Sequence, residues 1–188
     1  MDKLFITADD LLRDSFELAA KIYDSGFRPS FIVGIWRGGA PVGIAIQEFL
    51  HVLGCDSDHI AIRTSAYHSG IDRQRKAVQV HNLGYLLENL GADDRLLLVD
   101  DVFDTGRSLQ AVLDELDDRL PIPPAGIKIA CPWYKPNRNQ TQRAPDFCLH
   151  ETDQWLVFPH EITGLSYEEI NRKNPELAAL LAQRNTSE

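Results

Sequence analysis

Short apolar runs alternate along this chain with longer amphipathic stretches. Three segments are mostly apolar without a strict two-residue period, namely residues 31–35, 96–99 and 126–131. This pattern predicts strands that are buried on both faces of a parallel sheet. Apolar residues recur at helical spacing from 7 to 26 and from 109 to 116, which predicts amphipathic helices. This alternation predicts an α/β fold, a Rossmann-like parallel sheet flanked by helices. Ligands of such sheets bind beyond the carboxyl ends of the strands, so the candidate site lies there.

Weaker patterns fill the rest of the chain. The alternation over residues 59–64 predicts another strand, and Val78 and Val80 predict the strand in which the chain returns. A proline-rich break at 121–124 separates the third long helix from the strand that follows it. The remaining expected elements, in chain order, are a helix up to Leu53, a helical turn over 85–90, a short strand from 145, and terminal helices of which the last begins at Pro175.

Composition narrows the class of protein. A chain of 188 residues with 44% hydrophobic residues is long enough for one well-buried core, so we expect a single domain over 1–188. A net charge of −9 disfavours a nucleic-acid partner, whose phosphates need a basic face. No stretch approaches the roughly 20 apolar residues of a membrane span, so we expect no membrane partner and a cytoplasmic location. Three widely spaced cysteines predict neither a disulfide framework nor a zinc site.

The segment after the strand at 96–99 has the most informative chemistry. Asp100 and Asp101 come first, and the turn Asp104-Thr105-Gly106-Arg107-Ser108 then leads into a helix. A helix N-terminus has N–H groups without partners, and a glycine lets them approach a phosphate closely. The two carboxylates would repel a phosphate, so a fitting ligand offers them hydroxyls or a metal ion. A phosphorylated sugar meets both conditions, whereas the plain structural alternative is a buried strand followed by a capped helix.

This whole run resembles the phosphoribosyl-pyrophosphate (PRPP) signature of the type I phosphoribosyltransferases. The resemblance implies that Asp100 and Asp101 hold the ribose and a Mg²⁺ ion, and that the turn 104–108 binds the 5′-phosphate. It also implies that Asp104 assists proton removal from the acceptor base. The matching elements are contiguous, which makes the signature far more specific than a lone glycine motif.

Two further segments fit the same family. Arg37-Gly38-Gly39 follows the first strand, where the glycines allow close approach to an anion and the arginine supplies a fixed positive charge. In the family such a loop binds pyrophosphate, often with a cis peptide, which here would be Trp36–Arg37. The polar stretch with Ser65 and Tyr67 matches the flexible loop that closes over PRPP and shields the reacting sugar from water.

The last third resembles the purine branch of the family, in particular the xanthine-guanine and hypoxanthine phosphoribosyltransferases. Lys135, which precedes a proline, would bond the 6-oxygen of the purine, Trp155 would stack on the base, and the Leu156 backbone would bond its edge. Residues 132–160 would then contribute a small base-binding hood. The chain departs from these relatives at His160, where they often have a second Trp, and in the longer polar loop 137–144.

The predicted activity is transfer of 5-phosphoribosyl from PRPP to a 6-oxopurine, with Mg²⁺ as cofactor and pyrophosphate as leaving group. A phosphoribosyltransferase for another base, a non-catalytic regulator that senses PRPP or nucleotides, and a purely structural α/β protein are the alternatives. Family members usually form dimers or tetramers, so the resemblance also implies a homo-oligomer.

Overall fold

The computed structural model describes residues 3–66 and 78–185. The chain forms two compact units, a large one over residues 9–153 and a small one that joins residues 1–8 to 154–188. Each unit is described by itself. The hood predicted over 132–160 includes residues of both, and its role stays a prediction.

The large unit is built on a seven-stranded sheet in which the predicted parallel strands are confirmed. Among the described strands of this sheet, β4 runs antiparallel to β3 and every other pair is parallel. Two short strands, β6 and β8, flank the C-terminal end of β7. The order of the strands across the sheet is β4 (Val78–His81), β3 (Asp58–Ala66), β2 (Phe31–Trp36), β5 (Arg95–Val99), β7 (Gly126–Tyr134) and β8 (Phe147–Glu151). β6 (Val102–Phe103) follows β5 in the chain and also pairs with β7.

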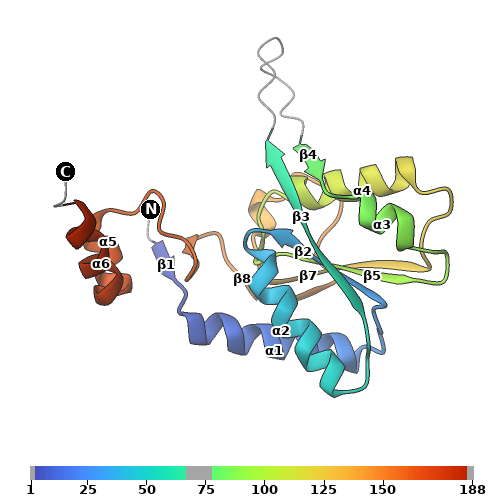
Figure 1. Cartoon of the computed structure of the whole chain (residues 1–188), viewed down its shortest axis with the longest axis horizontal. Coiled ribbons are helices and arrows are strands. Elements are labelled where there is room, and N and C mark those ends of the chain that lie inside the picture. The colour runs from blue at the N-terminus through green and yellow to red at the C-terminus, as the bar shows by residue number, and fades with distance from the viewer. Residues whose placement is uncertain (1–2, 67–77, 186–188) are drawn as a thin grey trace, which may run out of the picture. The chain divides into compact units, whose positions relative to one another are not determined.

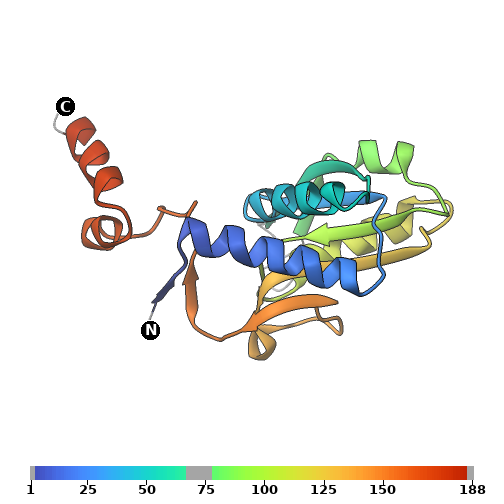
Figure 2. The ribbon, with the colours of Figure 1, turned by 90° about the horizontal axis from the view of Figure 1, so that it is seen from below.

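Helices cover both faces of this sheet. In Figure 1, α1 (Ala8–Asp24) and α2 (Gly39–Val52) lie below the sheet, and α3 (Gly84–Asn89) and α4 (Arg107–Arg119) lie above it. Seen from below, α1 is the helix nearest the viewer (Figure 2). Val33 and Leu98 pack with the leucines of α4, while their neighbours Ile32 and Leu97 are equally buried. Burial on both faces explains why the strands read as continuous apolar runs.

One strand is longer than its sequence pattern predicts. The apolar run predicts an end at Cys131, but β7 continues through Pro132 to Tyr134. The extension forms because β6 and β8 pair with Trp133 and Tyr134 from opposite edges. Their pairing compensates for the proline, which removes one ladder donor. The result is that Lys135 begins directly at the carboxyl end of a core strand.

The small unit pairs the two ends of the chain. β1 (Lys3–Phe5) runs parallel to β9 (Trp155–Val157), and two helices follow, α5 (Tyr167–Lys173) and α6 (Pro175–Asn185). α5 begins with a capping box in which the Ser166 and Glu169 side chains each bond the other's backbone N–H. Glu169 also forms an ion pair with Lys3 at 2.6 Å. The prediction that the last helix begins at Pro175 is confirmed.

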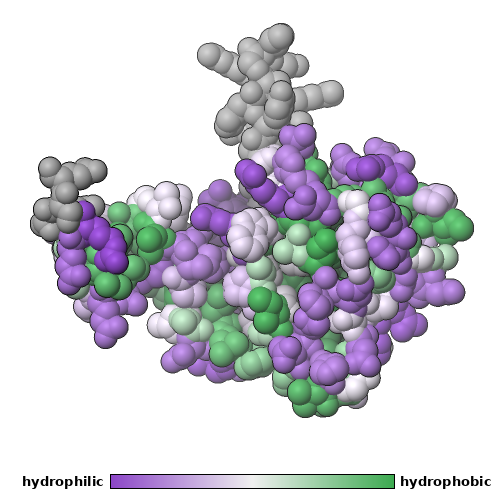
Figure 3. All heavy atoms as spheres, viewed as in Figure 1, coloured by the Kyte–Doolittle hydropathy of each residue, from purple (hydrophilic) through white to green (hydrophobic). Residues whose placement is uncertain are grey.

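On the face seen in Figure 3, hydrophilic side chains predominate, with apolar side chains between them. Among the large apolar side chains of the described residues, the most exposed is Val52 at the end of α2, at 82%. Among the described residues, no helix is long and apolar enough to cross a membrane.

Candidate active site

The loop after β2 packs directly against the end of β5. The Trp36–Arg37 peptide bond is cis, as the resemblance implies. A Cβ atom added at Gly39 would lie 2.2 Å from the Val99 carbonyl oxygen, and one at Gly38 would lie 1.9 Å from Asp101 Oδ2. Only glycine fits at position 39, where the neighbouring atoms are backbone, and a side chain at position 38 would displace the Asp101 carboxylate. Two segments that the sequence predicts separately, 37–39 and 100–101, therefore form one surface.

Asp100 and Asp101 form a like-charged pair at this surface. Asp101 is 7% exposed, and its backbone N–H donates to Asp100 Oδ1 at 3.0 Å. Burial raises the pKa of the Asp100 carboxyl well above its usual value, and the neighbouring charge of Asp101 raises it further. The backbone N–H groups of Asp101 and Gly39 oppose this rise in pKa. A cation or hydroxyl donors bound here would relieve the repulsion.

Cys131 lies beside this pair and is completely buried. Burial raises the pKa of its thiol well above the usual value, and the charge of Asp100 acts in the same direction. A thiol that stays protonated is a poor nucleophile and a poor metal ligand. Cys131 is therefore an unreactive thiol.

The turn before α4 has a conformation that only glycine adopts readily. Gly106 has φ +75°, and a Cβ there would lie 2.6 Å from two ring atoms of Phe103. The backbone N–H of Gln140 donates to the Thr105 carbonyl at 3.0 Å, which ties the turn to the loop after β7. Arg107 is exposed at the start of the helix. The turn thus places a helix N-terminus at the same edge of the sheet as the acidic pair.

Asp104 lies between two cations. Its Oδ1 atom is 2.7 Å from Arg138 Nε, and its Oδ2 atom is 3.6 Å from Lys135 Nζ. Lys135 is 5% exposed, so its charge is held inside the protein against this carboxylate. Its backbone N–H donates to the Phe103 carbonyl at 2.9 Å, which fixes the start of the loop. The structure therefore brings together Asp104 and Lys135, predicted on separate grounds.

Arg138 is the residue of this site that the sequence analysis missed. It ends a short 3₁₀ helix, η1 (Pro136–Arg138), inside the polar loop 137–144. The available signal was an arginine three residues after Lys135, one turn of a 3₁₀ helix away. In a loop rich in polar residues that spacing did not stand out.

Four other predicted residues are not among these contacts. Ser65 is on β3, where its Oγ atom is 2.9 Å from His81 Nε2, and Tyr67 lies outside the described residues. Trp155 and Leu156 are on β9 of the small unit. The Trp155 ring is 53% exposed, while Leu156 is buried at 6%. An exposed ring is available for stacking, but the base-binding roles of both residues stay predictions.

Comparison with known proteins identifies the family. The profile of the phosphoribosyl transferase domain matches residues 7–169. A hypoxanthine-guanine phosphoribosyltransferase of Lactococcus lactis is 26% identical over 186 residues, which cover 96% of this chain and 91% of that protein. The bifunctional protein PyrR of Akkermansia muciniphila is 29% identical over 127 residues, 66% of this chain and 68% of that protein.

A solved structure agrees with these matches. The crystal structure of a purine phosphoribosyltransferase from Pyrococcus horikoshii is 31% identical, with a TM-score of 0.66 over 88% of this chain and 98% of that one. The chain belongs to the type I phosphoribosyltransferase family, on its purine branch, and is a pentosyl-transferring enzyme.

Proposed function

We propose that this enzyme transfers the 5-phosphoribosyl group of PRPP to a ring nitrogen of a 6-oxopurine and releases pyrophosphate. The observation that carries the proposal is the buried Lys135, held 3.6 Å from the Asp104 carboxylate at the end of β7. A buried ammonium beside a carboxylate supplies a hydrogen-bond donor and a proton acceptor at one place. A 6-oxopurine offers the complementary pair, a carbonyl oxygen and an imidazole N–H.

The leaving group is assigned to the loop 37–39. Breaking the bond between the ribose anomeric carbon and pyrophosphate leaves positive charge on the sugar and negative charge on the leaving group. Arg37 is exposed at this loop and supplies a positive charge there. The glycines keep the backbone open to the ligand. Arg37 thus stabilises the pyrophosphate as its charge develops.

The acidic pair is assigned to the ribose. Asp100 and Asp101 orient the sugar hydroxyls as acceptors, and the turn 104–108 anchors the 5′-phosphate. Anchoring the phosphate uses binding energy from a remote part of the substrate to place the reacting carbon. Once the new carbon–nitrogen bond forms, the proton on the base nitrogen passes to Asp104. The Arg138 charge lies beside the same carboxylate, with Nε 2.7 Å from Asp104 Oδ1.

The donor set also suits Mg²⁺. Magnesium in phosphate-transferring sites is usually held by one or two carboxylates together with substrate phosphates and water. Two carboxylates lie here, one with a pKa raised by burial and by the neighbouring charge, and no group of three or more acidic, His or Cys side chains that could hold a metal ion occurs within 3–66 and 78–185. Asp100 and Asp101 would hold the ion. When bound, it neutralises charge on the pyrophosphate.

The proposal is tested by mixing the protein with Mg²⁺, PRPP and each of xanthine, guanine and hypoxanthine, and by measuring nucleotide formation. We expect a monophosphate from at least one of the three bases. Thermal melting with and without PRPP and Mg²⁺ is the first step, because binding to the native state raises the melting temperature. Adenine and uracil complete the panel.

The outcomes separate the alternatives. A product from adenine or uracil alone would replace the purine assignment with a phosphoribosyltransferase for that base. Stabilisation by PRPP without product from any base would favour a sensing role. Failure of PRPP to stabilise the protein would overturn the assignment of the whole strand-end site.

A further inference from the structure

A pocket lies between α4 and the start of β7, among residues to which the proposed reaction gives no role. Its volume is about 230 Å³. That is below the roughly 300–1,000 Å³ typical of drug-sized ligand sites, so its occupant must be small. The apolar lining comes from the buried face of α4 and from the chain that leads into β7, and includes Leu113, Leu116, Leu120, Pro124 and Ile127.

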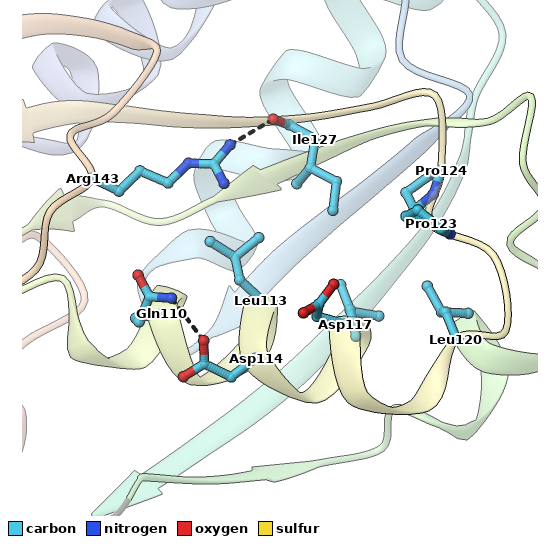
Figure 4. A pocket seen from close by; sticks show the side chains of 10 residues that line it. Gln110, Leu113, Asp114, Asp117, Leu120, Pro123, Pro124, Ile127 and Arg143 are labelled. Atoms are coloured by element: carbon cyan, nitrogen blue, oxygen red, sulfur yellow. Dashed lines mark hydrogen bonds between the residues drawn. The ribbon is translucent and has the colours of Figure 1, made fainter.

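Charges of opposite sign border this apolar lining. Arg143 lies on the β7 side of the pocket and Asp117 on the α4 side (Figure 4). Among the described residues, the Arg143 side chain makes one hydrogen bond, from Nη2 to the Ile127 carbonyl at 2.8 Å. Most of its donors therefore remain for a ligand. Asp114 adds a second carboxylate, held by Gln110 Nε2 at 2.7 Å.

We propose that this pocket binds a small aliphatic zwitterion of the α-amino acid class. A guanidinium is a strong, bidentate partner for a carboxylate. The carboxylates of α4 suit an ammonium group, and the leucine-lined floor suits a branched aliphatic side chain. A simple anion would be repelled by Asp114 and Asp117, and a simple cation by Arg143. A ligand that carries both charges satisfies the whole lining.

The pocket is connected to the turn 104–108 through the loop that contains Arg143. The Arg143 carbonyl accepts hydrogen bonds from Thr141 Oγ1 at 3.0 Å and from Asn139 Nδ2 at 2.9 Å. Thr141 Oγ1 lies 2.9 Å from the point that a Cβ on Gly106 would occupy. α4 itself begins at this turn and lines the pocket from Gln110 onwards. A ligand in the pocket therefore acts on the 5′-phosphate turn and changes the affinity of the enzyme for PRPP. This regulatory part of the proposal rests on the proposed function.

The binding test uses the whole chain and a panel of free compounds. Thermal melting and calorimetry are carried out with L-leucine, 4-methylpentanoate, isoamylamine and glycine. We expect saturable stabilisation by L-leucine, because it alone carries both charges and the branched side chain. Equal binding of 4-methylpentanoate or isoamylamine, or no binding of L-leucine, would overturn the assignment of a zwitterion site.

Variants test the two charged walls. Arg143→Gln should raise the leucine concentration at half-saturation at least about tenfold, since a charge-assisted bond is lost. Asp117→Asn, an exposed position on α4, should raise it about threefold to tenfold without a risk to folding. Arg119→Gln is the matched control, because this exposed arginine ends the same helix, pairs with Glu115 and does not line the pocket. Unchanged leucine binding in both Arg143→Gln and Asp117→Asn would contradict the proposal.

Coupling is measured as the PRPP concentration at half-saturation with and without saturating L-leucine. We expect a shift of about fivefold or more, matched by an equal shift of leucine affinity when PRPP is saturating, since coupling is reciprocal. Leucine binding without such a shift would overturn the regulatory part of the proposal. If PRPP itself fails to bind, the proposed function fails while the leucine result stands independently.

Discussion

The carboxylates at the end of β5 and those of the turn before α4 belong to one short segment, but their surroundings are opposite. Asp100 has a like charge beside it and a raised pKa. Asp104, four residues later, lies between the cations of Arg138 and Lys135, at 2.7 and 3.6 Å. Aspartate side chains of one short segment thus have different electrostatic surroundings, which suit them to different roles. Burial and a neighbouring like charge act on Asp100, whereas Asp104 lies against two cations.

The two surroundings also differ in how they are built. The acidic pair faces backbone, at glycines where any side chain would collide with Asp101 or Val99. Asp104 faces long basic side chains from the loop after β7. Backbone packing leaves little room to adjust, while side chains can turn towards a ligand or away from it. We therefore expect substitutions at the two places to act on different properties of the enzyme.

The largest expected effect is on the chemical step, through Asp104. Asp104→Asn keeps the shape of the side chain but removes the proton acceptor, so kcat with a 6-oxopurine should fall by about 10²–10⁴-fold, the usual contribution of general base catalysis. Steady-state kinetics with the preferred base measures this. Asp118→Asn, an exposed position on α4, is the control and should leave kcat unchanged. A wild-type rate in Asp104→Asn would remove Asp104 from the reaction.

A smaller effect is expected from the arginine that the sequence analysis missed. Arg138→Gln removes a partly exposed partner of Asp104, and exposed pairs contribute about 0.2–1 kcal/mol. We expect kcat/KM to fall about threefold to fivefold, with the melting temperature nearly unchanged. Arg138→Lys should restore only part of the loss, because a lysine lacks the fixed fork geometry of arginine. A loss in Arg138→Gln as large as that in Asp104→Asn would mean that Arg138 contacts the substrate itself.

The smallest expected effect is on stability, at Asp100. Because the pKa of the Asp100 carboxyl is raised in the folded protein, the folded state binds this proton more tightly than the unfolded state does. Its contribution to stability is complete below the ordinary pKa of an aspartate and is lost as the pH rises through the raised value. Asp100→Asn removes that loss, so the variant should melt a few degrees above wild type at neutral pH.

Melting curves from pH 4 to pH 7 test the sign of this effect. The difference in melting temperature between Asp100→Asn and wild type should grow as the pH rises, while Asp118→Asn should show no such trend. A variant less stable than wild type at pH 7 would show that Asp100 is not a site of unrelieved repulsion. It would also weaken the assignment of a cation or hydroxyl donors to this pair.

Much of the fold was accessible from periodicity alone. The core strands β2, β5 and β7 and the helices α1 and α4 were predicted because long apolar patterns reflect burial, which depends on local sequence. The short strands β1 and β6 were not, since two or three residues carry no period. Both exist through pairing with distant partners, β9 and β7. The extension of β7 past Pro132 has the same origin.

For the site, the sequence by itself determined the chemistry available. It supplied the Asp-Asp pair, the glycine loops, the basic residues and their order along the chain, because motif spacing is a local property. Only the tertiary structure decided which of these groups meet. It set Gly38 against Asp101 and placed Arg138 and Lys135 around Asp104, since those contacts depend on how neighbouring strands end at one edge of the sheet. Opposite electrostatic surroundings for identical side chains arise from packing, which no local pattern specifies.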